Sequence, residues 1–398
     1  LASGGAAAAA AALPPRRARA AADPAARAEA LHAEIWRRFI DPHGVMLDFT
    51  APDGSVAIPT PEECRLGKPN ALGWWSPIEN GGFFNGLYME AAVHRWRASK
   101  ADADAAKVRR LAAGLMRLAS VSDVKGFVAR GFATDGRSHY AMGSDDQTLP
   151  WFLGLWRYLE TGLASAEERA AIVAKLVETA DEIRGRGWQM PAEPPFGVRG
   201  GFAGFLYYQA PRLLFVARMM HAVTGDASWD AVYRAALHER GGPEDLSRLE
   251  LCARGLVYDH GGPGRRHSWT ASNCVAVQRA LWEMETDASV RAAYARGLER
   301  SAAVAMESLP VAQELDPAAL PPFEADWRKL NDLWEPQPTI AKATEVAEAQ
   351  SKLLSRLSPR RAEHRWVREP AAAAWIVTLA PDADRKSTRL NSSHVSQS

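Results

Sequence analysis

Two adjacent carboxylates, Asp145 and Asp146, are the strongest candidates for chemistry in this chain of 398 residues. They stand in the stretch Ser144 to Gln147, directly before an apolar run that begins with Trp151 and Phe152. Like charges held close together raise the pKa of one partner, so such a pair can keep one carboxyl protonated near neutral pH. The pair therefore predicts a general acid.

Two helix registers are open around these aspartates. If Ser144 is the N-cap with Gln147 as its capping-box partner, both carboxylates lie in the first turn, where the helix dipole favours negative charge. Pro150 favours a later start at Thr148, because a proline beyond the first turn removes a helix hydrogen bond. With that later start, which we prefer, both aspartates and Gln147 lie in a loop that faces a cleft.

A second group of candidates surrounds Glu79. The residues from Ser76 to Glu79 match a capping box with proline at the first helical position, which gives Glu79 a structural role. The neighbouring Trp74, Trp75 and Asn80 are typical of a sugar-binding wall, because rigid indole rings pack on the apolar faces of sugars. A substrate contact from Glu79 therefore stays open beside the structural one.

Four segments dense in polar and aromatic residues each lead into an expected helix. They are Gly73–Gly86, Phe127–Trp151, Pro191–Phe202 and Tyr258–Asn273. Arginine can bind a carboxylate through two parallel hydrogen bonds, so the arginines among them suit an acidic sugar. The cationic and polar candidates in these segments are Arg130, His139, Tyr140, Arg199, Arg266 and His267, with Asp259, His260 and Trp269 in the last segment.

These candidates fall into two predicted roles. Acid and base chemistry is expected from Asp145, Asp146, His139 and Tyr140. Substrate contacts are expected from Trp74, Trp75, Glu79, Asn80, Arg130, Gln147, Arg199, His267 and Trp269.

Several other kinds of site lack their motifs. The chain has no H-E-x-x-H pair, no phosphate-binding glycine loop and no G-x-S-x-G elbow, and we predict no metal and no cofactor. Its three cysteines, Cys64, Cys252 and Cys274, are too dispersed for a disulfide framework and are expected to be buried thiols. Since 48 basic residues face 47 acidic ones, we expect neither a nucleic-acid nor a membrane partner. The oligomeric state stays open.

Apolar residues recur at helical spacing along the whole chain. Helices are expected near 24–40, 82–99, 101–120, 148–162, 166–184, 202–223, 227–239, 269–285, 288–307, 341–356 and 362–379. Their connections alternate between short turns and long loops, and short turns make neighbouring helices antiparallel. In a closed ring of such hairpins all long loops gather at one end, so we predict an all-α, (α/α)6 toroid. An open array of helical repeats would show a fixed period, which is not found.

The stretch Ser144–Gln147, together with Trp151, Phe152, Trp156 and Tyr158, resembles the catalytic segment of the six-hairpin glycosidase-like superfamily. The likeness is to its unsaturated glucuronyl and rhamnogalacturonyl hydrolases, and the hairpin rhythm matches over most of residues 24–380. It implies that Asp145 or Asp146 protonates the enol ether of a Δ4,5-unsaturated uronic acid and directs water to it. The tryptophan-rich R-G-N-G-W signature of those enzymes is missing, with Arg199–Phe202 as a loose counterpart.

The leading interpretation is a glycoside hydrolase that acts on oligosaccharides or polysaccharides containing uronic acid. A second is a polysaccharide lyase, in which Tyr140 and His139 serve as acid and base. A third is a non-catalytic sugar-binding scaffold. An isoprenoid cyclase is disfavoured, because the stretch from Asp145 to Leu149 lacks the last aspartate of a D-D-x-x-D magnesium site.

Both ends of the chain are expected to lie outside the helical domain, which we place at 23–383. Residues 1–22 begin with an Ala-rich stretch typical of the end of an export signal or of a disordered leader. The export signal would place the protein in the periplasm or outside the cell, and otherwise we expect a cytoplasmic protein. Residues 384–398 begin with a stretch that resembles the translation of a sequencing adapter, so we expect the natural C-terminus to differ.

Overall fold

The computed structural model describes residues 23–256, 268–310, 316–359 and 367–381. Within these ranges the chain is predominantly helical, and the strands are two to four residues long. The predicted all-α class is therefore confirmed at the level of secondary structure.

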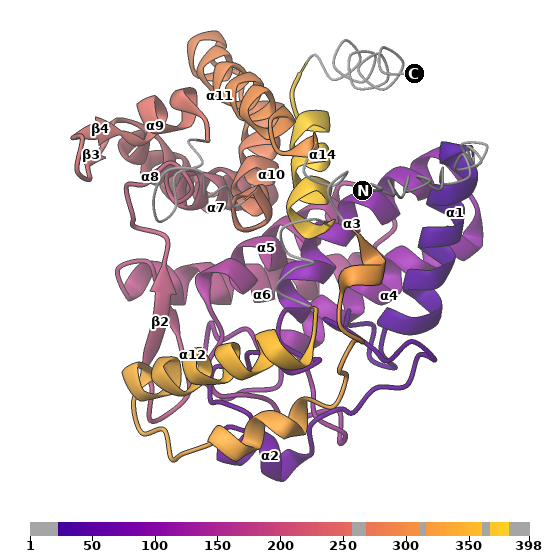
Figure 1. Cartoon of the computed structure of the whole chain (residues 1–398). Helices are drawn as coiled ribbons and strands as arrows, with labels where there is room; N and C mark the ends of the chain where they lie inside the picture. Colours follow the sequence, from indigo (N-terminus) through magenta and orange to yellow (C-terminus); the bar gives the residue numbers. More distant parts are fainter. Residues whose placement is uncertain (1–22, 257–267, 311–315, 360–366, 382–398) are drawn as a thin grey trace, which may run out of the picture.

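The helices carry most of the described chain (Figure 1). The longer ones are α1 (Pro24–Glu34), α3 (Gly81–Ser99), α4 (Asp102–Leu118), α5 (Asp145–Leu159), α6 (Ala166–Gly185), α7 (Ala210–Thr224), α8 (Ala227–His238), α10 (Ser268–Met284), α11 (Ala288–Met306), α12 (Ile340–Leu357) and α14 (Glu369–Thr378). The shorter ones are the π-helical turn η1 (Ile35–Phe39), α2 (Pro61–Leu66), α9 (Arg248–Arg254) and the 3-10 turns η3 (Pro317–Ala319) and η4 (Trp327–Leu333). Two antiparallel hairpins pair β1 (Gln189–Pro191) with β2 (Val198–Gly201) and β3 (Arg240–Gly241) with β4 (Leu246–Ser247).

Most predicted helices begin and end within three residues of the observed bounds, but two do not. The helix expected at 202–223 begins only at Ala210, because Arg248 donates to the carbonyls of Ala203 (2.8 Å) and Gly204 (2.7 Å) and holds that segment as a loop. The helix expected at 362–379 is described as α14, and residues 360–366 lie outside the described ranges. Helices α2 and α9 lie in segments that were expected to be loops.

Burial separates the helices into two layers. From Gln147 onward every residue of α5 is buried, and α7 is buried from Ala210 to Met220 except at Arg218. In α4, by contrast, the buried positions Val108, Leu111, Leu115 and Leu118 follow one face. A helix that is apolar all round belongs to the interior, and an amphipathic one to the surface, so α5 and α7 form an inner layer.

α3 and α5 run in the same direction, as two contacts along them show. The N–H of Phe83 near the start of α3 donates to Gln147 near the start of α5 at 2.9 Å. Further along, Arg157 of α5 pairs with Glu90 of α3 and with Glu283 of α10, each at 2.8 Å. At the start of α7, Arg212 pairs with Asp145 at the start of α5. The loops that lead into α3, α5 and α7 therefore meet at one end.

α12 braces the loop that leads into α3. Gln350 of α12 donates to the carbonyl of Pro69 at 2.6 Å and accepts from Asn70 at 2.9 Å. In Figure 1, α12 and α2 lie together at the lower side of the molecule, away from α11. The loop that carries Trp74 and Trp75 is thus fixed from outside.

α3 and α5 approach each other closely at two glycines. A Cβ added at Gly86 of α3 would overlap the carbonyl oxygen of Pro150, and one added at Gly154 of α5 would lie 2.9 Å from the Cα of Gly86. Only glycine fits this crossing without moving a backbone.

We expect Gly86→Ala to lower the free energy of unfolding by about 1–3 kcal/mol, because the added methyl overpacks a backbone contact. Gly185→Ala is the control, since nothing lies within 4 Å of the Cβ it adds at the end of α6. Urea titrations compare the two variants with the wild type. Equal stability of Gly86→Ala and Gly185→Ala would contradict the close crossing.

Candidate functional site

Arg130 is the centre of the candidate site. Its side chain is buried, with 1% of its surface exposed, and its guanidinium donates three hydrogen bonds to two different loops. Nε bonds the carbonyl of Met142 at 3.0 Å, Nη1 the carbonyl of Glu79 at 2.8 Å, and Nη2 the hydroxyl of Ser144 at 3.2 Å. One buried cation therefore fastens the loop before α3 to the loop before α5.

α5 begins earlier than expected. Ser144 is its N-cap residue, and the N–H of Thr148 donates to the carbonyl of Ser144 at 3.0 Å, so the predicted start at Thr148 is wrong. Pro150 lies inside the helix and costs one hydrogen bond, which would have gone to the carbonyl of Asp146. Both aspartates thus occupy the first turn, where the helix dipole favours their charge.

The two aspartates have different partners. Asp145, with 23% of its side chain exposed, forms an ion pair with the buried Arg212 of α7. Asp146 accepts a hydrogen bond from the hydroxyl of Ser144. Burial opposes the charge of Asp146, but Arg130, Ser144 and Arg199 outweigh it and hold the pKa of this carboxyl below its usual value.

At a second pair of carboxylates, Asp48 and Glu79, burial outweighs the groups that favour their charge. Asp48 accepts from the backbone N–H (2.7 Å) and the side-chain amide (2.5 Å) of Asn80, and Glu79 accepts from the N–H of Trp75 (2.7 Å). Burial raises the pKa of both carboxyls, and the charge of Glu79 adds to the rise at Asp48. Two carboxyls that disfavour each other's charge hold a proton at higher pH than either would alone.

The capping box expected at Ser76–Glu79 is wrong. The hydroxyl of Ser76 donates to the carbonyl of Gly73 at 2.8 Å, and α3 begins only at Gly81. The carboxylate of Glu79 does not cap α3 but accepts from the N–H of Trp75, and its charge acts on Asp48.

Gln147 links the two carboxylate groups. Its amide nitrogen donates to Asn80 at 2.8 Å, and its amide oxygen accepts from the N–H of Phe83 at 2.9 Å. Asn80 in turn holds Asp48 through the two bonds described above. This chain of bonds joins the start of α5 to the start of α3.

Arg199 and two tryptophans complete the described part of the site. The guanidinium of Arg199 lies 5.5 Å from the ring centre of Trp74 and donates to the carbonyl of Gly143 at 3.2 Å. Burial and the nearby charge of Arg130 lower the pKa of Arg199 to about 10. Trp75 packs edge-on against Trp74 with ring centres 6.0 Å apart and donates to the carbonyl of Ala347 in α12 at 3.0 Å. Both rings are half-buried.

His139 and Tyr140 have partners of their own. Tyr140 is fully buried and donates to the carbonyl of Lys68 at 2.5 Å. His139 lies 3.1 Å from the carboxylate of Glu193, and that partner raises the pKa of the imidazole against the effect of burial. Both residues are thus committed to holding loops together.

The remaining candidates fall outside the described parts. Arg266, His267, Asp259 and His260 belong to residues 257–267, and the side chain of Trp269 at the start of α10 is likewise not described.

Three charged residues of the site were not predicted: Asp48, Arg212 and Arg368. Asp48 and Arg212 are single charges within apolar runs, VMLDF and PRLLF, which is a signal that could have marked them. Arg368 lies directly before α14, where burial lowers its pKa to about 10 although Glu79, Glu369 and Asp48 favour its charge.

Comparisons with protein-family models, with curated proteins and with solved structures give no match to this chain. In the described part, no three histidine, cysteine or acidic side chains are grouped so that they could hold a metal ion. No helix of that part has the length and apolar character needed to cross a bilayer.

The opposite pKa shifts of Glu79 and Asp146 predict opposite effects on stability. A raised carboxyl pKa gives stability that is complete below the unfolded value of about 4.3 and is lost as the pH rises. A lowered one gives stability that is present above about 3.9 and is lost as the pH falls. At pH about 7.5, Glu79→Gln should therefore be more stable than the wild type, and Asp146→Asn less stable by about 2 kcal/mol.

Both differences in stability should shrink at pH about 4. There the Glu79 carboxyl is protonated, and the Asp146 carboxyl begins to take up a proton. Urea unfolding at the two pH values measures them. The control is Glu62→Gln, which removes an exposed ion pair with Arg65 worth less than about 1 kcal/mol. A loss of stability at neutral pH in Glu79→Gln equal to that in Asp146→Asn would contradict the assignment.

Proposed function

We propose that this protein is a glycoside hydrolase that acts on oligosaccharides carrying a Δ4,5-unsaturated uronic acid. One observation carries the proposal: carboxyls whose pKa values are shifted in opposite directions lie around one buried arginine, Arg130. Sites that use one carboxyl as acid and another as base require this separation.

The Asp48–Glu79 pair is the proton donor in this proposal, and Asp146 is the base. The pair gives a proton to C4 of the substrate's double bond, while Asp146 accepts a proton from the water that adds to C5. The resulting C5 hemiketal opens to a ketone, and the C1 hemiacetal formed by ring opening becomes an aldehyde as it releases the rest of the oligosaccharide as an alcohol. The lowered pKa of Asp146 suits a base better than the donor role expected from the sequence. Asp145, through its ion pair with Arg212, is a positioning residue.

Arg199 and Trp74 are the proposed substrate contacts. A half-buried guanidinium beside an indole ring offers paired hydrogen bonds to a carboxylate and an apolar face to a sugar ring. Among described residues, Arg199 has one hydrogen bond, to Gly143, so donors remain for a uronate.

We further propose that the helices close into an (α/α) toroid. The support lies in the succession of neighbours, in which α3 packs on α5, α5 on α7, α7 on α10 and α10 on α14. The short turns after α3, α5, α7 and α10 lie where hairpins of such a ring need them.

The lyase alternative finds less support. Its acid and base, Tyr140 and His139, are engaged with Lys68 and Glu193, and Tyr140 is fully buried. Burial also raises the pKa of Tyr140 well above its usual value, which opposes its use as a proton donor or acceptor near neutral pH.

The test uses lyase-generated oligosaccharides with an unsaturated uronic acid at the non-reducing end. The wild type should remove the ultraviolet absorbance of their double bond. Glu79→Gln and Asp146→Asn should each lower kcat by about 10²–10⁴. Asp53→Asn, which changes an exposed aspartate bonded to Ser55, should leave kcat unchanged.

Each alternative gives a different result. A lyase would create the same absorbance from saturated polymer, and a sugar-binding scaffold would bind the oligosaccharides without changing them. Either result, or full activity in Glu79→Gln and Asp146→Asn, would refute the proposed hydrolase.

A further inference from the structure

A cavity of about 720 Å³ lies between α3, α10 and α14. Its volume falls in the range of about 300–1,000 Å³ that is typical of small-molecule sites. The middle of its wall is apolar and is formed by Phe84, Leu87 and Tyr88 of α3, Ala276 of α10, and Ala372 and Trp375 of α14.

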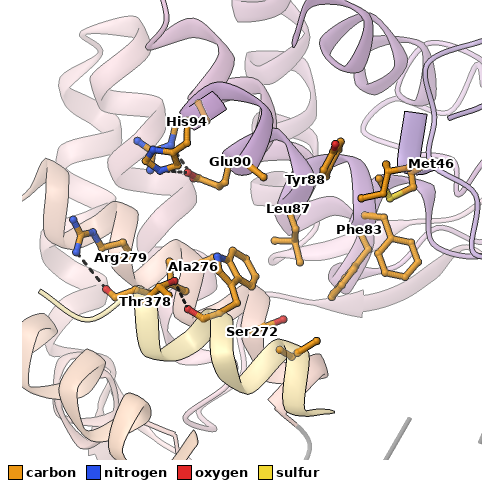
Figure 2. Close-up of a pocket in the computed structure, with 18 of the residues that line it drawn as sticks. Met46, Phe83, Leu87, Tyr88, Glu90, His94, Ser272, Ala276, Arg279 and Thr378 are labelled. Atoms are coloured by element: carbon orange, nitrogen blue, oxygen red, sulfur yellow. Dashed lines mark hydrogen bonds and ion pairs between the residues drawn. The ribbon is translucent and has the colours of Figure 1, made fainter. Parts of the chain in front are cut away.

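The two ends of the cavity differ. Figure 2 shows Glu90, His94 and Arg279 at one end and Met46 and Phe83 at the other, with Leu87 between them. At the charged end, Arg279 pairs with Glu283 at 2.8 Å, and Arg157 pairs with Glu90 and Glu283 at 2.8 Å. These charges compensate one another and do not call for a charged ligand.

The opposite end adjoins the candidate site. Arg368 lines the cavity, and its charge interacts with the carboxyls of both Glu79 and Asp48. Phe83 also lines it, while the N–H of Phe83 holds Gln147 in the network that links the two carboxylate groups. The cavity thus begins beside the proposed proton donor and leads away from it along α3.

We infer that this cavity binds an apolar aglycone, an aromatic or short alkyl group attached to the uronic acid whose release is proposed above. The inference rests on that proposed function and adds the class of substrate. The wall at Leu87 and Trp375 offers no hydrogen-bond partners to sugar hydroxyl groups, so the leaving sugars of an oligosaccharide stay outside the cavity. An apolar group, by contrast, gains free energy by leaving water there. The sugar itself stays at the carboxylates.

The experiment compares 4-nitrophenyl and methyl glycosides of an unsaturated uronic acid. In the wild type, kcat/KM should be about tenfold or more higher for the nitrophenyl glycoside, as expected for burial of an aromatic ring. Ala372→Trp fills the cavity from α14, and Ala91→Trp fills it from α3. Both variants should lose the preference for the nitrophenyl glycoside, while kcat/KM for the methyl glycoside changes little. Ala171→Trp, on the exposed side of α6, should keep it.

Two cavity variants from opposite walls are tested, so that misfolding of one does not decide the result. An equal preference in the wild type and both cavity variants would overturn the inference and leave the hydrolase intact. If neither glycoside is cleaved, the proposed function fails. Calorimetry with the same nitrophenyl glycoside then tests whether the cavity binds it. Binding that is lost in Ala372→Trp and Ala91→Trp but kept in Ala171→Trp would support it, and equal binding or none in the wild type would refute it.

Discussion

The buried guanidinium of Arg130 is the interaction on which the candidate site depends. It joins the carbonyls of Glu79 and Met142 to the hydroxyl of Ser144, and so holds together two loops that lead into different helices. Its charge also favours the ionised forms of Asp48, Glu79 and Asp146. A buried cation of this kind is stable only when carboxylates surround it, and carboxylates can be crowded here only because the cation is present.

The helical frame makes this crowding possible. Since glycines at the crossing of α3 and α5 let the two backbones touch, the starts of both helices lie within reach of one amide, Gln147. Within that frame, differences in the partners of each carboxyl shift their pKa values in opposite directions. At Asp146 a hydroxyl and several cationic neighbours outweigh burial, whereas at Asp48 and Glu79 burial outweighs the hydrogen bonds and cations.

Much of the frame could be predicted from the sequence, because buried helix faces repeat at a fixed spacing. The gathering of Trp74, Glu79, Asn80 and Arg130 near the aspartates also followed from the rhythm of long and short connections. The starts of α5 and α3 could not. The N-cap residue Ser144 of α5 accepts from the buried Arg130, and the N-cap residue Asn80 of α3 donates to Asp48, and neither partner is a neighbour in the chain. Asp48, Arg212 and Arg368 were missed for the same reason, since their partners lie far away in sequence.

The central claim is that the Asp48–Glu79 pair keeps a proton at neutral pH while Asp146 is ionised. Infrared spectroscopy with carboxyl-labelled aspartate and glutamate tests it directly, because a protonated carboxyl has a C=O stretch of its own. We expect that band in the wild type and in Asp146→Asn near neutral pH, and its loss when Asp48→Asn and Glu79→Gln are combined. A wild-type spectrum without a protonated carboxyl, or a band unchanged in that double variant, would contradict the account.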